Sequence, residues 1–302
     1  MVELRATAEN TFVRAYAGDV YNTAVYLKRS LPDAQVKFLT AVGDDATSRA
    51  MRNAWVSEGI DDTVAFTEEG GLPGLYVIDT DSRGERRFQY WRSNSAARRW
   101  LSLLQAQGES VLWGADIIYF SGIALAILNS NERSSAIELL RRVRTHVGRI
   151  AFDPNVRLAL WETAQTAAET IESALSICDV ALPSSEDIER LFGLEEPGQQ
   201  ANLLLAMGVR ELALTLGSSG CLVIDGEVRA RLPAPAVDKV VDTSGAGDAF
   251  NGAYLATRLR GGSAEKAAQD GLMVASRVVT HAGAIVPKSI SHPRDSGYLR
   301  SL

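Results

Sequence analysis

From about residue 110 onward, short apolar runs alternate with stretches whose apolar residues recur at helical spacing. The apolar runs predict buried strands at residues 117–120, 150–152, 180–182 and 212–216. The helical stretches cover residues 131–144, 162–176, 186–192 and 264–280. Strands that alternate with helices form a largely parallel sheet with helices on both faces. The pattern therefore predicts an α/β fold.

Two further pairs of runs predict antiparallel hairpins. Residues 221–224 and 228–232 flank an Asp-Gly pair, which is typical of a tight hairpin turn. Residues 75–78 and 87–92 are rich in strand-forming side chains and flank the polar segment 79–85. Each pair is therefore expected to add two antiparallel strands to the fold.

The second hairpin is expected to join residues 11–17 in a small sheet that lies over the site as a lid. The lid strands would be drawn from about residues 11–19 and 64–95. A doubly wound domain normally begins with a full buried strand, and none is visible before this segment. Either the main sheet lacks that strand or residues lie upstream of Met1.

Glycine and polar residues follow the predicted core strands directly. Ser121-Gly122 and Asp153-Pro154-Asn155 follow the first two strands, and the segment from Gly217 to Gly220 follows the fourth. In doubly wound sheets, ligands bind beyond the carboxyl ends of the strands. The functional site is therefore expected among these residues.

The run from Asp242 to Phe250 carries the clearest chemical signal. Two carboxylates, Asp242 and Asp248, bracket a turn of small residues. Apolar residues then recur at i, i+3, i+4 and i+7 from Phe250, which predicts a helix that ends at Gly261-Gly262. A lone turn of this kind is more often a glycine-rich helix start with a capping aspartate. The second carboxylate, the helix and the rest of the chain favour a functional site.

The chemistry of this turn suits an anion. Gly245 and Gly247 allow backbone conformations that a Cβ disfavours. Backbone N–H groups of such a turn can converge on one point, where the helix dipole also favours negative charge. We therefore expect a phosphoryl group in transfer to bind there, with Asp248 placed to take a proton from an attacking hydroxyl.

Composition narrows the classes of function. The chain has 302 residues, of which 46% are hydrophobic and 23% charged, and its net charge of −6 argues against a nucleic-acid partner. No apolar run approaches the ~20 residues that cross a bilayer, and no signal peptide is visible, so a cytoplasmic protein without a membrane partner is expected. The two cysteines, Cys178 and Cys221, lack metal or redox spacing and fit buried thiols in a reducing compartment.

Several common motifs are missing from the sequence. There is no Gly-x-x-x-x-Gly-Lys-Ser/Thr loop, which excludes a P-loop enzyme. No Gly-x-Gly-x-x-Gly follows a first strand, which weakens a dehydrogenase reading. No His-Glu-x-x-His or paired-cysteine metal site is present.

The segment from Asp242 to Asp248 resembles the C-terminal signature of the ribokinase-like (PfkB) sugar kinases, and the resemblance covers nearly the whole chain. The signature is specific for fold and phosphoryl transfer but not for substrate. Tyr90-Trp91-Arg92 and Asn155-Val156-Arg157 carry the substrate expectation, because they resemble segments of 2-keto-3-deoxygluconate kinases. The supporting segments are residues 18–24, 74–76, 84–86, 90–92, 120–125, 153–157 with 160–161, and 283–287.

The resemblance implies a single ribokinase-like kinase domain over residues 1–302, with a Rossmann-like, mostly parallel sheet flanked by helices and a small β-sheet lid. It implies transfer of the ATP γ-phosphoryl group to the C6 hydroxyl of 2-keto-3-deoxygluconate, with Mg²⁺ as cofactor and a monovalent cation such as potassium as a further candidate. Exposed lid strands also favour pairing between copies, so a homodimer or larger assembly is expected.

The resemblance also assigns roles to single residues. Asp248 would be the catalytic base, and Gly245, Ala246 and Gly247 would form the anion hole. Glu186 would act on magnesium indirectly. The substrate-binding set would be Gly18, Asp19, Asn22, Tyr76, Tyr90, Arg92, Arg157 and Asp248. The nucleotide-binding set would be Asn155, Arg157, Thr215, Gly217, Gly220, Gly245 and Gly247.

An independent argument favours an acid sugar. Planar, bidentate recognition of a carboxylate favours arginine, and Arg92 and Arg157 lie at strand ends where they can clamp a carboxylate or a phosphate. Equally, both arginines could be ordinary surface charges.

Other positions also have structural alternatives. Tyr90 and Trp91 could alternate on a packed strand, so that only one of them faces the site. Asn22 could cap a helix that begins at Thr23. Gly217 and Gly220 could form a plain tight turn. Glu186 could be a first-turn helix charge.

Four positions depart from the family pattern. Ala17 stands where glycine is usual, Ala159 where a second arginine often follows Arg157, and Thr215 where lysine is common. Pro183 replaces the asparagine of an Asn-x-x-Glu element whose glutamate is Glu186. The alternatives are therefore a fructokinase- or ribokinase-type sugar kinase, and a non-catalytic sugar or nucleotide sensor.

Overall fold

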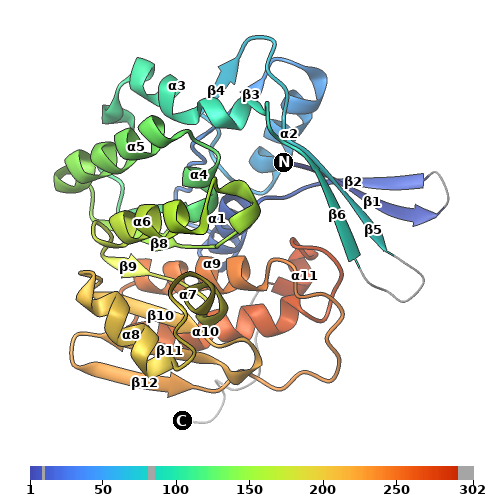
Figure 1. Cartoon of the computed structure of the whole chain (residues 1–302). Coiled ribbons are helices and arrows are strands. Elements are labelled where there is room, and N and C mark those ends of the chain that lie inside the picture. The colour runs from blue at the N-terminus through green and yellow to red at the C-terminus, as the bar shows by residue number, and fades with distance from the viewer. Residues whose placement is uncertain (9–10, 81–85, 292–302) are drawn as a thin grey trace. The chain divides into compact units, whose positions relative to one another are not determined.

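The computed structural model describes residues 1–8, 11–80 and 86–291 of the chain (Figure 1). The chain divides into two compact units. The smaller unit comprises Met1–Tyr21 and Gln35–Val111, and the larger comprises Asn22–Ala34 and Leu112–Leu302. Among the described residues, none of the helices is both long and apolar enough to cross a membrane.

The smaller unit contains a four-stranded sheet in the order β2-β1-β5-β6. Its strands are β1 (Val2–Ala8), β2 (Thr11–Tyr16), β5 (Leu75–Thr80) and β6 (Arg86–Trp91). The predicted hairpin is confirmed, because β5 and β6 pair antiparallel with Tyr76 opposite Tyr90. Most of its polar connection, residues 81–85, lies outside the described residues.

Two details of this unit differ from the sequence prediction. The first strand, β1, is an inner strand that runs parallel to β5, although the sequence analysis placed no strand there. The strand β4 (Ala65–Glu68), within the range expected for the lid, pairs instead with β3 (Thr40–Gly43) in a separate two-stranded sheet. The sequence pattern predicts where strands lie but not which strands pair with one another.

The helices of the smaller unit were also missed. They are α2 (Ala46–Ser57) and α3 (Trp100–Gln107). Asp45 caps α2 by accepting hydrogen bonds from the backbone N–H groups of Thr47 and Ser48. Although burial opposes it, hydrogen bonding with Ser48 and Thr47 lowers the pKa of Asp45 below its ordinary value. This capping signal was visible in the sequence, since a strand and an Asp precede the helix.

The larger unit contains the predicted six-stranded sheet, in the order β12-β11-β10-β9-β8-β7 (Figure 1). Strands β7 to β10 are parallel, and β11 and β12 form the antiparallel hairpin expected at one edge. The bounds are β7 (Ile117–Ser121), β8 (Arg149–Asp153), β9 (Val180–Ala181), β10 (Glu211–Thr215), β11 (Cys221–Asp225) and β12 (Val228–Leu232). All six strands were predicted from the apolar runs.

Helices bury both faces of this sheet. Ala151, Ala213 and Val223 pack on one face against α9 and α10. The alternate residues of the same strands, such as Phe152 and Leu214, are equally buried and face the other side. The helices of this unit are α1 (Asp19–Ser30, of which residues 22–30 belong here), α4 (Gly122–Ala126), α5 (Ser130–Val143), α6 (Ala164–Leu175), α7 (Ser185–Phe192), α8 (Pro197–Ala206), α9 (Ala246–Leu259), α10 (Ala264–Val278) and α11 (Lys288–Ser291).

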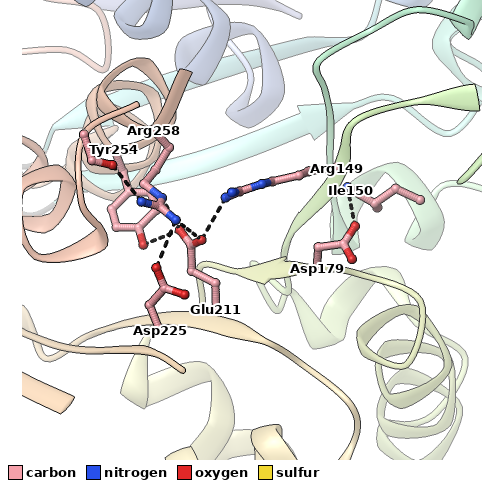
Figure 2. Close-up of polar contacts among 8 residues, drawn as sticks. Arg149, Ile150, Asp179, Glu211, Asp225, Tyr254 and Arg258 are labelled. Carbon is pink, nitrogen blue, oxygen red and sulfur yellow. Dashed lines mark hydrogen bonds and ion pairs between the residues drawn. The ribbon is translucent and has the colours of Figure 1, made fainter. Parts of the chain in front are cut away.

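A buried ionic cluster lies where the parallel strands begin (Figure 2). The carboxylate of Glu211, the first residue of β10, accepts hydrogen bonds from Tyr254 (2.7 Å), Arg149 (2.9 Å) and Arg258 (2.8 and 2.7 Å). Arg258 also reaches Asp225 at 3.0 Å. Burial and the neighbouring charge of Glu211 raise the pKa of Tyr254. The cluster fixes the C-terminal half of α9. The first turn of α9 lies at the other end of the helix.

Both cysteines are free and buried in the larger unit, as the sequence predicted. Burial raises the pKa of the Cys178 thiol and of the Cys221 thiol to about 12. Neither thiol is therefore an ionised nucleophile at neutral pH.

Candidate active site

The turn before α9 is held by a buried carboxylate and a close backbone contact. Asp242 accepts hydrogen bonds from the backbone N–H groups of Ser244 (2.9 Å) and Gly283 (2.6 Å). Gly245 has a φ of 73°, and a Cβ at this position would lie 2.5 Å from the carbonyl oxygen of Ala284. Only glycine therefore fits position 245, as the sequence predicted.

The helix begins four residues earlier than predicted. Because α9 starts at Ala246, Gly247 and Asp248 lie in its first turn. Gly247 does not have a positive φ, so the expected reason for this glycine is wrong. A Cβ at Gly247 would meet nothing within 4 Å, so the space before this turn is open. The short side chains there leave room for a ligand at the positive end of the helix dipole.

The backbone N–H groups of this turn are not all available. The N–H of Ala246 donates to Thr243 at 3.2 Å, so its expected place in the anion hole is not supported. Within the described part of the chain, the N–H groups of Gly245 and Gly247 have no acceptor. These two groups remain as anion donors, since early N–H groups of a helix lack partners in the helix itself.

Asp248 is oriented by a side chain from α1. The Nδ2 of Asn22 donates to Oδ2 of Asp248 at 2.8 Å. The contact is possible because Gly252 lets α9 approach α1 closely: a Cβ at 252 would lie 2.6 Å from the carbonyl oxygen of Thr23 and 2.7 Å from the N of Leu27. This amide donor fixes the orientation of the carboxylate.

The structure excludes the capping alternative for Asn22. It lies inside α1, which starts at Asp19, so it does not cap a helix that begins at Thr23. Gly18 immediately precedes the helix and has a φ of 151°, which a residue with a Cβ rarely adopts. Gly18 and Asp19 belong to the smaller unit.

The aromatic residues expected to contact the substrate share one face of the four-stranded sheet. Tyr76 and Tyr90 are cross-strand partners with ring centroids 5.7 Å apart, and the guanidinium of Arg92 lies 4.3 Å from the centroid of the Tyr90 ring. Trp91 must point to the opposite face, because side chains alternate along a strand. Tyr90 and Trp91 therefore lie on opposite faces of the sheet, as the sequence predicted, and Tyr76 lies on the same face as Tyr90.

Glu3 was missed as part of this group. Its buried carboxylate accepts a short hydrogen bond from the Tyr76 hydroxyl and pairs with Arg5 at 2.6 Å. Burial and the nearby charge of Glu3 raise the pKa of Tyr76, which keeps its hydroxyl a hydrogen-bond donor. The signal in the sequence was the alternation of Val2-Glu3-Leu4-Arg5, which places Glu3 and Arg5 on one face.

The segment that follows β8 has a constrained backbone. Asn155 has a φ of 33°, and it is the one residue other than glycine with positive φ in the described part of the chain. Asp153 accepts a hydrogen bond from the N–H of Asn155 at 2.9 Å and stabilises this turn. Arg157 is exposed, and its Nη1 donates to the carbonyl of Val156 at 2.9 Å.

Asp187 in α7 supports the same segment and was missed by the sequence analysis. Burial raises the pKa of Asp187, while a hydrogen bond with Ser184, the charge of Arg157 and the N–H of Val156 act in the opposite direction. Asp187 thus gives Arg157 a nearby negative charge. The family pattern pointed to Glu186 instead, one residue away and on a different side of the helix.

The residues expected to bind nucleotide follow β10. The hydroxyl of Thr215 donates to the carbonyl of Pro183 at 3.3 Å, and so does its N–H at 3.0 Å, so Thr215 links the ends of two strands. Gly220 is required by packing, since a Cβ would lie 1.9 Å from the carbonyl oxygen of Leu232. Gly217 has a φ of 57° and open space around it. The tight-turn alternative therefore explains Gly220, whereas Gly217 has room for a ligand beside it.

Glu186 is a first-turn residue of α7 whose side chain is 77% exposed and pairs with Arg190 at 2.5 Å. Within the described residues, no group of three His, Cys, Asp or Glu side chains is arranged to hold a metal ion. Magnesium commonly keeps several waters and binds through substrate phosphates with one or two carboxylates.

Comparison with known proteins assigns the chain to a family. Residues 2–290 match the model of the pfkB family carbohydrate kinases. A 2-dehydro-3-deoxygluconokinase of Escherichia coli strain K12 is 39% identical over 281 residues, which cover 91% of each chain. A 2-dehydro-3-deoxygluconokinase of Dickeya dadantii is 40% identical over 280 residues, which cover 91% of this chain and 90% of the relative.

A solved structure shows the same fold. The aminoimidazole riboside kinase of Salmonella enterica, complexed with aminoimidazole riboside and an ATP analogue, superposes with a TM-score of 0.81 at 24% identity. The match covers 96% of this chain and 93% of that one. The ribokinase-like α/β fold expected from the sequence is confirmed. The chain belongs to the pfkB family of carbohydrate kinases.

Proposed function

We propose that this enzyme is an ATP- and Mg²⁺-dependent kinase that phosphorylates 2-keto-3-deoxygluconate (2-dehydro-3-deoxy-D-gluconate) at its C6 hydroxyl. The relatives at 39 and 40% identity carry that activity in their names. The observation that carries the proposal is the first turn of α9. There the Asp248 carboxylate, held by Asn22 at 2.8 Å, follows the backbone N–H groups of Gly245 and Gly247 in the chain, and the space beside Gly247 is open.

In this proposal Asp248 takes the proton of the C6 hydroxyl while the hydroxyl oxygen forms a bond to the γ-phosphorus of ATP. The bond from that phosphorus to the β-phosphate bridging oxygen breaks, and ADP leaves. The N–H groups of Gly245 and Gly247 and the dipole of α9 stabilise the charge on the transferring group. Positioning and electrostatics supply most of the rate in phosphoryl transfer.

We infer that the sugar is bound mainly by Gly18, Asp19, Tyr76, Tyr90 and Arg92, together with Arg157. Gly18 permits close backbone approach, Asp19 offers acceptors to hydroxyl groups, and the Tyr76 hydroxyl is kept as a donor by Glu3. Arg92, held against the Tyr90 ring, and Arg157 suit the carboxylate of a sugar acid, because guanidinium matches a carboxylate bidentately. Asn22 acts mainly through Asp248.

We infer that nucleotide binds beyond β10, where Gly217 leaves open space, with Asn155 and Arg157 on the phosphates. Magnesium bound with ATP supplies neutralisation of phosphate charge. Glu186 would reach it through water, and a monovalent cation remains a proposed activator. Thr215, which donates to the carbonyl of Pro183, stays a proposed nucleotide-binding residue of this loop.

We further propose that the four-stranded sheet is the lid of a single ribokinase-like domain and excludes water from the reaction. Its edge strands β2 and β6 expose large apolar side chains, namely Phe12, Val13, Phe88 and Trp91. Exposed apolar edges favour pairing with a second copy, so a homodimer is proposed, to be tested by sedimentation. The free, buried thiols fit the cytoplasm.

A substrate panel tests the proposed function. Purified enzyme with ATP and Mg²⁺ would be offered 2-keto-3-deoxygluconate, its galactonate-derived isomer, fructose and ribose, with ADP release as the readout. We expect the highest kcat/KM for one of the keto acids. Faster turnover of fructose or ribose would replace this proposal with a neutral-sugar kinase. Calorimetric binding without ADP release from any sugar would indicate a sensor.

A further inference from the structure

A chain of buried polar side chains crosses the larger unit behind the proposed catalytic aspartate. Asn251 lies three residues after Asp248 on α9 and is only 2% exposed. Its Nδ2 donates to Oδ2 of Asp153 at 2.8 Å and to the hydroxyl of Tyr119 at 3.3 Å. Thr23, the neighbour of Asn22 on α1, reaches the same Tyr119 hydroxyl at 3.4 Å. The side chains therefore connect α9, α1 and the end of β8.

Asp153 uses its two carboxylate oxygens for different partners. Oδ2 accepts from Asn251 on α9, and Oδ1 accepts from the N–H of Asn155 in its own turn at 2.9 Å. That turn holds Asn155 at a φ of 33°, in the left-handed region that asparagine occupies more readily than most residues with a Cβ. Asp153 thus ties this turn directly to the helix of the base.

A second contact also constrains this turn. A Cβ at Gly122 would lie 1.9 Å from the carbonyl oxygen of Pro154, so only glycine allows the observed approach. The turn therefore contacts Gly122 through Pro154 and Asn251 through Asp153. A buried carboxylate also requires hydrogen-bond donors, and Asn251 is one of the donors that satisfy Asp153.

We propose that Asn251 and Asp153 are positioning residues for phosphoryl transfer. The pair sets the placement of the Asp153–Arg157 turn, with Asn155 and Arg157, relative to Asp248 in the first turn of α9. Neither side chain needs to touch a substrate to do this. The inference rests on the proposed kinase activity but not on which sugar is phosphorylated. A displacement of about 1 Å at such a distance from the chemistry can lower a rate by about a hundredfold.

The test exchanges the two side chains. Asp153→Asn places two amides face to face, and Asn251→Asp places two carboxylates face to face. The double variant restores one amide donor and one carboxylate: Nδ2 of residue 153 can donate to residue 251, while its Oδ1 still accepts from Asn155. We expect each single change to lower kcat by about 10- to 100-fold and the double variant to regain most of it.

A control variant separates positioning from general stability. Tyr254→Phe removes another buried hydrogen bond of α9, the one to Glu211 at 2.7 Å, at the end of the helix away from Asp248. It is expected to lower Tm and to leave kcat unchanged. The single variants at 153 and 251 should instead lower kcat while the KM for ATP stays within about threefold.

Two results would overturn the inference. One is kcat close to that of the wild type in both single variants, whatever their Tm. The other is a double variant that folds but is no faster than the slower single variant. All rates are measured with the sugar that the wild type phosphorylates best, so a different sugar preference would change the proposed function without affecting this test. If the wild-type enzyme phosphorylates no sugar, both the proposed function and this inference are wrong.

Discussion

At the scale of single residues, the hydrogen bond between Asn22 and Asp248 determines the orientation of the carboxylate that we propose as the base. An amide donor at 2.8 Å fixes one carboxylate oxygen of Asp248. The asparagine side chain is neutral, so it orients the carboxylate without adding charge. Asn22 on α1 therefore orients the carboxylate, and Asp248 on α9 accepts the proton.

Replacing Asp248 tests the proton transfer. Asp248→Asn should lower kcat at least about a hundredfold, because an amide cannot accept the proton. Binding of ATP, measured by calorimetry, should stay close to that of the wild type. Glu138→Gln is the matched control, since this carboxylate pairs with Arg141 on the exposed side of α5 and its loss should keep normal turnover. Near-native turnover of Asp248→Asn would contradict its role as base.

The two arginines are tested by comparing substrates of different charge. Arg92→Ala and Arg157→Ala should each raise KM for acid sugars more than for neutral sugars, because only acid sugars carry a carboxylate. Arg141→Ala, which removes an exposed partner of Glu138 on α5, should change neither constant. Equal increases for acid and neutral sugars would argue against a carboxylate clamp.

At the scale of elements, the crossing of α1 and α9 at Gly252 brings Asn22 to Asp248. Gly252→Ala places a Cβ at 2.6 to 2.7 Å from the backbone and side chain of α1, so the helices must separate. We expect a loss of about 1–3 kcal/mol in unfolding free energy, as for other overpacked sites, together with a lower kcat. Gly198→Ala in α8, where the nearest atom would lie at 3.9 Å, should not destabilise. An unchanged kcat in Gly252→Ala would show that the crossing does not position the base.

The N-cap of α2 gives a pH-dependent prediction. Because the folded pKa of Asp45 is lowered, the unfolded chain binds more protons in the acid range, and stability rises with pH there. The contribution is present above the unfolded pKa of about 3.9 and is lost as pH falls through the lower folded value. Asp45→Ala should therefore cost about 1 kcal/mol at pH 7 in urea unfolding. Below pH ~3.9 the difference from the wild type should shrink.

Asparagine provides the matched control for this cap. Asp45→Asn keeps a side-chain oxygen for the N–H groups of Thr47 and Ser48 but cannot titrate. Its stability should match the wild type more closely than Asp45→Ala at pH 7, with a smaller slope in the acid range. A wild-type slope in Asp45→Asn would assign the pH dependence to other carboxylates.

The sequence predicted the features that leave a local pattern and missed the contacts between residues far apart in the chain. Apolar runs identified the four parallel strands of the larger sheet, since burial on both faces leaves a local pattern, and the Asp-Gly turn identified the hairpin that includes the exposed strand β12. The start of α9 was placed four residues late, because Gly247 and Asp248 are poor helix formers that only the folded site accommodates. Asn251 and Asp153, about a hundred residues apart, gave no local signal for their contact, although Asn22, Asp248 and Gly245 were all singled out from their motifs.

At the scale of the whole molecule, stability and chemistry use opposite ends of α9. The Glu211 cluster anchors the C-terminal half of the helix (Figure 2), whereas Asp248 lies in the first turn. Glu211→Gln removes one of the two carboxylates that pair with Arg258, whose side chain is only 12% exposed, and leaves Asp225 as its partner at 3.0 Å. Breaking a buried ion pair completely costs about 3–5 kcal/mol, and the remaining pair with Asp225 reduces that loss, so Tm should fall while kcat at 25 °C stays close to that of the wild type. A large loss of kcat in folded Glu211→Gln would show that the cluster also shapes the active site.

The two buried thiols provide a natural probe of how this protein opens. Cys221 lies within β11, and Cys178 lies just before β9, so a reagent reaches either sulfur only after the surrounding structure opens. With both pKa values near 12, the sulfurs also react slowly until they meet water. The rate of alkylation of the wild-type chain therefore measures the opening free energy of the six-stranded sheet, with no label introduced.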